Sequence, residues 1–293
     1  MSLERAHLAL EGLSVADAFG EQLLHAGPAT RQLALGERTV ALPSATRKWM
    51  WTDDTAMAVS IVETLAVHDG IDIDDLAQRY AKRYLAQPAR GYGRGAHHIL
   101  EQIAHGVPWD AAAKSVFDGQ GSCGNGGGMR SAPIGAYFCT DLAAVVEHAT
   151  RSAAPTHAHP DGIAGAVAVA VAAARTFDGE RDPRALLEAV VAHTPKGLTC
   201  DGVRRAIALL RAEPITVAAE LGNGSRVLAS DTIPFAIWCA ATNLGDYANA
   251  LWSCASVGGD IDTTCAMAGG IIVGAVGLAG IPADWRAARE PLP

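Results

Sequence analysis

Several features that mark common protein classes are scarce in this chain of 293 residues. Charged residues make up only 18% of it, and the net charge is -8 without any lysine-rich block. Because proteins that bind polynucleotides depend on clustered basic side chains, the sequence argues against a nucleic-acid partner. Small anionic ligands are not excluded, since a glycine loop or a metal ion can hold them locally. The 49% of hydrophobic residues predicts a globular protein with little disorder.

Signs of secretion and of disulfide bonding are also missing. Residues 1–20 carry acidic side chains early and lack a basic segment followed by an apolar core, so they do not resemble a secretory signal. Six cysteines are scattered without CxxC spacing. We expect them to be small buried residues rather than a disulfide framework. Together these absences predict a cytoplasmic protein.

One uncharged run, residues 265–281, has 17 residues and is close to the lower bound for a membrane span. It is rich in glycine rather than leucine, it follows an acidic cluster, and no basic segment precedes it. These properties favour a helix buried in the protein core. We therefore expect no association with a membrane.

Apolar residues repeat with helical spacing in most segments, for example over residues 56–66 and 186–191. Strand-like alternation is nearly absent, and turn residues divide the chain at short intervals. No connection is long enough, or rich enough in proline, to be a linker between domains. The pattern predicts one all-α domain over residues 1–293, with a dozen or more helices. Its interior helices are expected to be rich in alanine and glycine, as in residues 162–174.

Two acidic clusters each precede a helical pattern. Their oxygen-bearing residues are Thr52, Asp53 and Asp54 in the first, and Asp260, Asp262 and Thr263 in the second. Either cluster alone is typical of a helix N-cap, where an oxygen accepts free backbone N–H groups. A cap uses one side chain, however, whereas each cluster has three. Adjacent carboxylates repel one another, which raises their pKa values unless a cation offsets the charge.

Oxygen donors without histidine or cysteine suit Mg²⁺, Mn²⁺ or Ca²⁺ rather than zinc. If the helices that start near residues 53 and 263 meet, six oxygens can hold two cations ~3.5–4 Å apart, the spacing of a metal pair that orients a substrate and activates water. We therefore hypothesise that the two clusters converge into a two-metal site. Asp53, Asp54 and Asp262 are the candidates for a carboxylate that directs the water.

Residues 121–135, GSCGNGGGMRSAPIG, form a glycine-rich segment before another helical pattern. Glycine permits positive φ and close backbone approach, so successive N–H groups can form an anion nest, with Arg130 available to supply charge. The segment lacks the GK[ST] ending of a P-loop, and no strand precedes it. A flexible surface loop is the alternative. The segment RGYGRG at residues 90–95 is a weaker loop of the same kind, which we expect only to connect two helices.

His157 and His159 lie in the segment THAHPDG without further nitrogen or sulfur ligands nearby. A metal site built on them is therefore disfavoured. We expect a hydrogen-bonding role at a ligand or in the core.

Six segments, taken in order, resemble the successive blocks of the ADP-ribosylglycohydrolase family. They are ADAFG (16–20), WTDDTAM (51–57), GNGGGMRSAPIG (124–135), THAHP (156–160), GGDIDTTCAMAGGIIVGAVG (258–277) and IPADW (281–285). The resemblance spans nearly the whole chain. It implies a single all-helical domain with a binuclear Mg²⁺ centre, or Mn²⁺ in its place. It also implies an enzyme that releases ADP-ribose from a modified protein side chain or from a small ADP-ribose conjugate.

The resemblance also implies roles for individual residues. The metal ligands it implies are Thr52, Asp53, Asp54, Asp260, Asp262 and Thr263. The residues it implies for binding the phosphates and ribose of the ligand are Gly124, Asn125, Gly126, Gly127, Gly128, Met129, Arg130 and His157.

The first block departs from the family pattern. Many members have a glutamate seven residues after the aspartate of this block, where this chain has Leu24; Glu21 is nearby but out of register. The first glycine of the block is replaced by Ala16. The departure weakens a serine-linked specificity, so hydrolysis of arginine-linked ADP-ribose is slightly favoured. The alternatives are a protein that binds ADP-ribose with little turnover, and a hydrolase of a small derivative such as O-acetyl-ADP-ribose.

Overall fold

Helices make up most of the protein, as the spacing of apolar residues predicts. A computed structural model describes residues 1–43 and 47–293, and within these residues it contains 17 α-helices and one 3₁₀ helix. The same residues contain no extended β-strand, only two isolated bridges that pair Trp49 with Arg289 and Gly124 with Leu228. The expectation of an all-α fold is confirmed.

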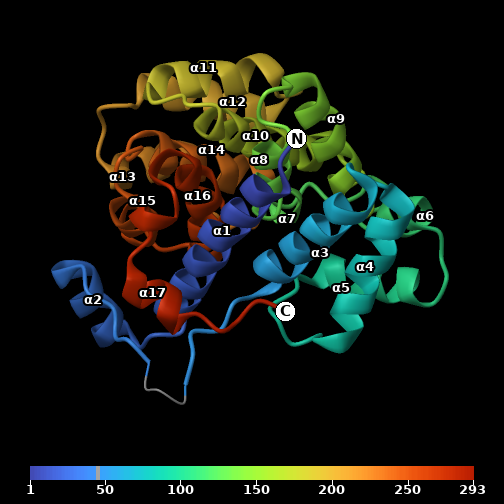
Figure 1. The fold of residues 1–293 in the computed structure, drawn as a ribbon, viewed down its shortest axis with the longest axis horizontal. Coiled ribbons are helices and arrows are strands. Elements are labelled where there is room, and N and C mark those ends of the chain that lie inside the picture. Colours follow the sequence, from blue (N-terminus) through green and yellow to red (C-terminus); the bar gives the residue numbers. More distant parts are fainter. Residues whose placement is uncertain (44–46) are drawn as a thin grey trace.

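The helices of the first half begin with a long N-terminal helix that runs through the middle of the molecule (Figure 1). They are α1 (Leu3–Leu24), α2 (Pro28–Glu37), α3 (Asp53–His68), α4 (Ile73–Ala86), α5 (Arg94–Ala104), α6 (Trp109–Lys114), α7 (Gly126–Met129), α8 (Ala132–Tyr137) and α9 (Leu142–Ala153). Those of the second half are α10 (Pro160–Phe177), α11 (Pro183–His193), α12 (Leu198–Ala208), α13 (Pro214–Leu221), α14 (Ala229–Ala241), α15 (Tyr247–Ala255), α16 (Ile261–Val276), η1 (Leu278–Gly280) and α17 (Ala283–Ala288).

The centre of the fold is the contact between α1 and α16, which pack along most of their lengths. Glycine allows this close approach. A Cβ atom on Gly12 would lie 2.7 Å from the carbonyl oxygen of Gly269, and one on Gly269 would lie 2.4 Å from the Cβ of Ala16. No side chain larger than hydrogen fits at these two positions without a shift of the neighbouring helix.

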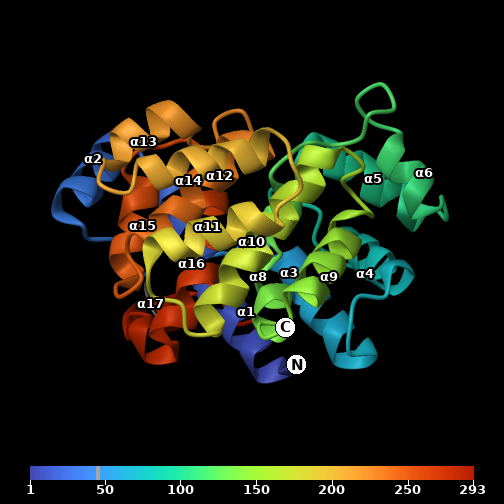
Figure 2. The ribbon, with the colours of Figure 1, turned by 90° about the horizontal axis from the view of Figure 1, so that it is seen from above.

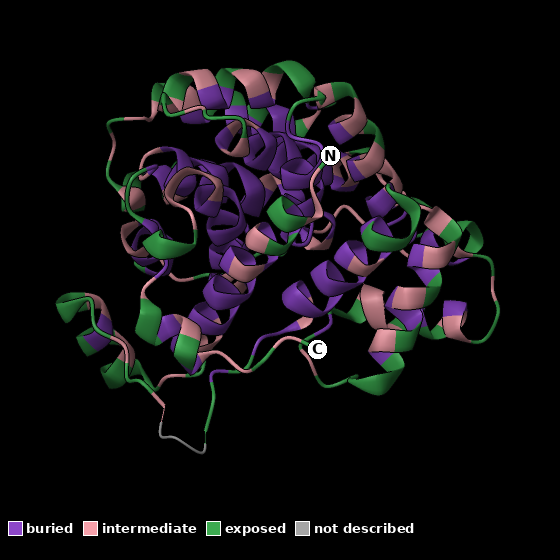
Figure 3. Ribbon diagram, in the orientation of Figure 1, coloured by how far each residue is buried: buried purple, intermediate pink, exposed green. Residues whose placement is uncertain are grey.

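Helix α10 lies in the interior and is buried on nearly all sides. Its residues from Ala164 to Ala174 are fully or almost fully buried, and they contact α7, α8, α9, α11, α14 and α16. Small side chains let this many neighbours approach one helix. The prediction of interior helices rich in alanine and glycine is therefore confirmed, and Figure 3 shows the buried residues concentrated in these central helices.

The uncharged run that begins at residue 265 belongs to α16, which is buried from Ile261 to Val273 apart from Asp262. The expected core helix is confirmed. Across the described ranges, none of the helices has the length and apolar character that a membrane crossing requires. All six cysteines are free thiols, and all but the partly exposed Cys123 are buried, as expected.

The ends of the molecule are more exposed than its centre. Figure 2 shows α2 at one end and the pair α5 and α6 at the other. In α2 only Ala34 is buried. The central helices therefore carry the core.

The packing of α1 on α16 predicts the effect of adding one methyl group. Gly12→Ala is expected to lower the free energy of unfolding by about 1–3 kcal/mol, because the added Cβ overpacks the core. The matched control is Gly36→Ala in α2, where an added Cβ meets nothing within 4 Å. It is expected to be neutral or to stabilise by up to about 1 kcal/mol, because alanine favours helix. Urea unfolding measures both; a Gly12→Ala variant as stable as Gly36→Ala contradicts this packing.

Candidate metal and ligand site

Three carboxylates from three different helices meet at the centre of the protein. Asp17 of α1, Asp54 of α3 and Asp262 of α16 each place one oxygen within 4.8 Å of the other two. Asp17 and Asp54 are buried, and Asp262 is partly buried. The structure therefore brings the two acidic clusters together although about 200 residues separate them in the chain.

Asp17 connects α1 to the start of α3. One carboxylate oxygen accepts hydrogen bonds from the backbone N–H of Thr52 (2.9 Å), the N–H of Thr55 (3.2 Å) and the hydroxyl of Thr55 (2.6 Å). Its other oxygen lies 3.0 Å from the Thr52 hydroxyl. Sequence reasoning assigned no role to Asp17. The signal was a single aspartate within an apolar helical segment, where an ionisable group is rarely buried without a partner.

Capping explains only one residue of the first cluster. Thr52 is the N-cap of α3, and its hydroxyl accepts from the N–H of Asp54 at 3.3 Å. The Oδ2 atom of Asp54 lies 2.8 Å from the same hydroxyl. Its Oδ1 atom is buried and, like Oδ1 of Asp262, has no hydrogen-bond partner among the described residues. Two carboxylate oxygens are thus buried and left available for a ligand.

The second cluster is held by a turn of two glycines. Gly258 and Gly259 have φ values of 68° and 78°, a region that disfavours other residues. A Cβ on Gly259 would lie 2.1 Å from the carbonyl oxygen of Asn223, which accepts from the N–H of Asp260 at 3.1 Å. The turn therefore fixes Asp260 at the start of α16.

Asp260 in turn contacts the glycine-rich segment. Its carboxylate accepts a 2.6 Å hydrogen bond from the side-chain amide of Asn125. The buried Thr263 side chain also stabilises the charged form of this carboxylate. Asn125 therefore links the predicted ligand loop to the acidic clusters.

The electrostatics of the clusters call for positive charge. Burial raises the pKa of Asp17 and that of Asp260 to about 7, and the charge of Asp262 adds to both shifts. Burial and the neighbouring carboxylates raise the pKa values of Asp53 and Asp54 well above their usual range. A divalent cation such as Mg²⁺ or Mn²⁺ fits this site. It prefers oxygen donors, it would contact the two unpartnered buried oxygens, and it would offset the repulsion between the carboxylates.

The acidic side chain of α1 nearest to this site is Glu21. It follows Asp17 by about one helical turn, and its Oε1 lies 2.9 Å from Nε2 of His25. Burial and the charge of Asp262 raise its pKa. Leu24 is the last residue of α1. An acid therefore stands beside Asp262 in this chain, three residues before the position that many family members use.

The glycine-rich segment is mostly helical in its second half. Of the glycines from 121 to 128, only Gly121 has a positive φ, at 76°. Residues 126–129 instead form the short helix α7. Gly124, Gly126, Gly127 and Gly128 therefore do not use the positive φ that glycine permits, and the segment is not an anion nest with alternating right- and left-handed residues.

Close packing explains the glycines instead. A Cβ on Gly127 would lie 2.9 Å from the carbonyl oxygen of Gly162, and one on Gly128 would lie 2.7 Å from Cδ1 of Ile233. A Cβ on Gly126 would lie 3.3 Å from Cε1 of His157. The glycines therefore let α7 lie against α10 and α14, and Met129 at its end is buried in the core.

Arg130 does not supply a free positive charge to the loop, contrary to the sequence-based expectation. The side chain is buried and its Nη2 donates to the Ser152 carbonyl oxygen (2.9 Å) and to the Thr156 hydroxyl (2.7 Å). Its guanidinium carbon lies 4.5 Å from the ring centroid of Tyr80. These partners hold the guanidinium in the core, where it joins α4, α9 and the segment before α10.

Arg130 acts on the site through His157. The Thr156 hydroxyl accepts from Arg130 and lies 2.8 Å from Nδ1 of His157. We infer that its single proton is donated to Nδ1, which leaves the proton of the neutral ring on Nε2. Burial and then the Arg130 charge lower the pKa of His157 to about 3, so the ring is neutral at physiological pH. Nε2 lies 3.5 Å from the Cβ position of Gly126, facing the loop.

His159 has a local role. Its Nδ1 accepts from the N–H of Asp161 at 3.1 Å, so the side chain caps the N-terminus of α10. This agrees with the expectation that the two histidines form hydrogen bonds.

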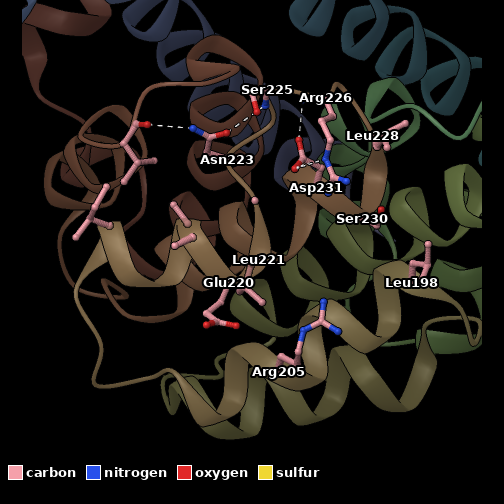
Figure 4. A pocket seen from close by; sticks show the side chains of 15 residues that line it. Leu198, Arg205, Glu220, Leu221, Asn223, Ser225, Arg226, Leu228, Ser230 and Asp231 are labelled. Atoms are coloured by element: carbon pink, nitrogen blue, oxygen red, sulfur yellow. Dashed lines mark hydrogen bonds and ion pairs between the residues drawn. The ribbon is translucent and has the colours of Figure 1, made fainter.

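A cavity of about 710 Å³ lies between α12, α13 and residues 222–228 (Figure 4). Its polar lining includes Arg205, Glu220 and the ion pair of Arg226 Nε with Asp231 Oδ1 at 3.0 Å. None of the three clustered carboxylates lines it. Gly224, which lies in the same loop, contacts Asp260, since a Cβ there would lie 2.5 Å from the Asp260 Cβ. The loop thus lies between the cavity and the acidic site.

Comparison with known proteins agrees with this geometry. A family model described as ADP-ribosylglycohydrolase matches residues 2–291. The chain belongs to the ADP-ribosylglycohydrolase family.

Curated relatives extend the match. ADP-ribosylhydrolase ARH3 of Xenopus tropicalis is 30% identical over 273 residues, which cover 82% of this chain and 77% of that protein. The human ADP-ribosylhydrolase ARH3 is 30% identical over 288 residues, covering 87% and 76%. An uncharacterised protein of Archaeoglobus fulgidus is 30% identical and covers 94% of this chain and 88% of its own length.

A solved structure described as an ADP-ribosylglycohydrolase-related protein complex shares the fold. Its TM-score is 0.67 with 23% sequence identity, and the match covers 98% of this chain and 93% of that one. The resemblance in sequence blocks is therefore confirmed at the level of the family and of the fold.

The raised pKa values in this ADP-ribosylglycohydrolase predict how its stability depends on pH. Asp17 and Asp260 have pKa values of about 7 in the folded protein and ordinary values near 3.8 when unfolded. Between these values the folded state binds more protons, so its stability falls as pH rises. His157 opposes this trend only weakly above pH 6.5: its pKa of about 3 keeps it neutral in the folded protein, whereas an unfolded histidine is half protonated at pH 6.5 and loses this proton by pH 8.

In EDTA, the free energy of unfolding is therefore expected to fall by about 1 kcal/mol between pH 6.5 and 8. Saturating Mg²⁺ is expected to stabilise more at pH 8 than at pH 6.5, because protons compete with the cation. Urea unfolding with and without Mg²⁺ checks both statements. A stability in EDTA that stays constant or rises over this range would contradict them.

Asp17→Asn separates the charge of this residue from its hydrogen bonds. The amide keeps an oxygen for the Thr52 and Thr55 donors but removes one buried negative charge. At pH 8 we expect the variant to be at least as stable as the wild type in EDTA. We also expect it to lose most of the stabilisation by Mg²⁺, which is about 2.7 kcal/mol at 100 times the Kd. The matched control is Asp161→Asn, since Asp161 accepts a backbone N–H from Thr199 outside the clusters. A normal Mg²⁺ response in Asp17→Asn would exclude it as a ligand.

Proposed function

We propose that this protein is a metal-dependent glycohydrolase that releases ADP-ribose from modified protein side chains. The observation that carries the proposal is the meeting of Asp17, Asp54 and Asp262, with two unpartnered buried oxygens, in a chain of the ADP-ribosylglycohydrolase family. Structural capping does not require three buried carboxylates from three helices at one point. Charge on this scale is best explained by cations and by chemistry that uses them.

The proposed cofactor is a pair of Mg²⁺ ions, with Mn²⁺ as a substitute. The ligands we propose are Asp17, which the sequence analysis did not include, and the six residues that it did: Thr52, Asp53, Asp54, Asp260, Asp262 and Thr263. Bound at this site, the ions supply positive charge that orients the hydroxyl groups of a ribose.

Hydrolysis of the glycosidic bond builds positive charge at the anomeric carbon, and a carboxylate can stabilise that charge and direct a water to it. Asp54 is 1% exposed, so water from the solvent does not reach it readily. Asp53 and Asp262 are partly exposed. We therefore propose these two as the carboxylates that act on the water, and Asp54 as a ligand and positioning group.

The phosphates and the adjacent ribose are proposed to lie along the glycine-rich segment. Donors for them are the backbone N–H groups at the start of α7 and Nε2 of His157. Because Arg130 is held in the core, the negative charge of the phosphates would be met by these donors and by the cations. Asn125 joins this part of the site to Asp260.

Among possible linkages we favour arginine. The guanidinium of an ADP-ribosylated arginine is cationic, and Glu21 places a further carboxylate beside Asp262, where opposite charge attracts such a leaving group. A glutamate in the position of Leu24, which many family members have, is absent here. Hydrolysis of O-acetyl-ADP-ribose and binding of ADP-ribose with little turnover are the alternatives that the same site permits.

One assay separates these functions. The protein is incubated with Mg²⁺ and, separately, with arginine-, serine- and acetyl-linked ADP-ribose, and free ADP-ribose is quantified. We expect release from the arginine-linked substrate, loss of release in EDTA, and a fall of at least about 100-fold for Asp262→Ala, the scale of one positioned acid or base. Asp201→Ala, an exposed change on α12, is the control. Tight binding of ADP-ribose without release from any substrate would show a binding protein instead of an enzyme.

A further inference from the structure

The segment that leads into α3 is held by residues near the end of the chain. The N–H of Trp49 donates to the carbonyl oxygen of Ala288 at 2.9 Å. The N–H of Glu290 donates to the carbonyl oxygen of Trp49 at 3.0 Å. Trp49 and Arg289 form a parallel bridge. Figure 1 shows the red segment after α17 running to the start of α3. Thr52, Asp53 and Asp54 follow directly after this pairing.

Three side chains extend the pairing into a clamp, which we define as Glu290, Arg90 and Trp51. The carboxylate of Glu290 accepts the N–H of Trp51 at 3.1 Å and faces both terminal nitrogens of Arg90, with Nη2 at 3.3 Å. Nη1 of Arg90 also donates to the carbonyl oxygen of Trp51 at 2.8 Å, and the guanidinium carbon lies 3.5 Å from a Trp51 ring centroid. Paired charged contacts of this kind are geometrically specific.

The clamp is largely shielded from solvent. The Arg90 side chain is 13% exposed and that of Glu290 is 15% exposed. An ion pair in this setting depends on both partners, because removal of one leaves the other charge buried and unpaired. A fully exposed pair would have little influence on its surroundings.

The clamp reaches the acidic site through two contacts. The carbonyl oxygen of Arg90 accepts the N–H of Asp53 at 2.7 Å. Gly91 has a φ of 93°, and a Cβ there would lie 3.5 Å from Oδ1 of Asp53. The RGYGRG segment thus borders the site, which goes beyond the simple connection expected from its sequence. The backbone N–H and carbonyl of Trp51 and the N–H of Asp53 are all fixed by the clamp.

We propose that Glu290 is a positioning residue for the metal cluster. Through Arg90 and Trp51, Glu290 holds residues 52–54 from the side of the C-terminal residues. Asp17 of α1 holds the same residues from the other helix. The inference rests on the proposed function in one respect, that the cluster binds divalent cations. Small displacements of such ligands are enough to weaken a site.

The test measures Mn²⁺ affinity of the full chain by titration calorimetry, with the thermal midpoint Tm recorded for each variant. Glu290→Gln is expected to weaken Mn²⁺ binding at least 10-fold, and excess Mn²⁺ should restore hydrolysis. The matched control is Glu11→Gln, which removes the 2.9 Å contact from Arg289 Nη2 to Glu11 Oε2. That pair anchors the same terminal segment to α1 without touching Trp51 or Arg90, so its loss is expected to change Mn²⁺ affinity less than twofold.

Two further variants decide the matter if Glu290→Gln does not fold. Arg90→Lys keeps the charge and loses the paired contact, so it is expected to weaken Mn²⁺ binding several-fold. The double variant Glu290→Gln with Arg90→Gln removes both charges and should lose no more affinity than Arg90→Gln alone, because both changes break one clamp.

The outcomes are distinct. Mn²⁺ affinities of Glu290→Gln and Arg90→Lys within twofold of the wild type overturn the inference, whatever happens to Tm. An equal loss in Glu11→Gln also overturns it, because general anchoring of the segment would then explain the effect. A wild-type protein that binds no Mn²⁺ overturns the proposed function and this inference together. A wild type that binds Mn²⁺ but releases no ADP-ribose leaves the role of Glu290 in metal binding to be judged on the affinities alone.

Discussion

The close contact between α1 and α16 is the constraint on which the rest of the structure depends. Along this contact the backbones of the two helices approach closely because glycine has no side chain. A Cβ on Gly20, for example, would lie 2.5 Å from the Cα of Asp262. Gly20 follows Asp17 by less than one helical turn. The packing that closes the core therefore also brings Asp17 to Asp262. In this member of the ADP-ribosylglycohydrolase family, the small residues of the central helices serve the acidic site as well as the stability of the fold.

The acidic site is a concentration of charge that the surrounding protein does not neutralise. None of the ion pairs within residues 1–43 and 47–293 involves Asp17, Asp54 or Asp262. Two arginines from segments that border the site have other partners: Arg130 is bound to Thr156 and Ser152, and Arg90 is bound to Glu290. Burial of such carboxylates opposes folding, so packing and hydrogen bonds must hold them. The three clustered carboxylates could hold a metal ion, which would offset this charge.

The parts of the site support one another through backbone contacts. The N–H of Thr52 donates to Asp17. The clamp of Glu290, Arg90 and Trp51 holds the residues on either side of Thr52. Asp260 is held between Asn223 and Asn125, which joins the glycine-rich segment to the second acidic cluster. His157 is oriented by Thr156 and thereby by Arg130. Side chains that define the chemistry are thus held by partners from distant parts of the chain, which limits their motion.

Local properties of the sequence were enough to predict the helices, the buried run in α16 and the hard-ligand character of the two acidic clusters, because periodicity and donor type belong to the residues themselves. Asp17, the burial of Arg130 and the role of Glu290 were not predictable in this way. A single aspartate, arginine or glutamate has no periodic signal, and its role depends on which distant surface it meets. The sequence by itself determined which segments become helical and which side chains can bind a hard cation. Only the tertiary structure decided which carboxylates share a site, and only it showed that the glycines at 126–128 are needed for close packing. The reason is that packing between helices depends on both segments and not on either one alone.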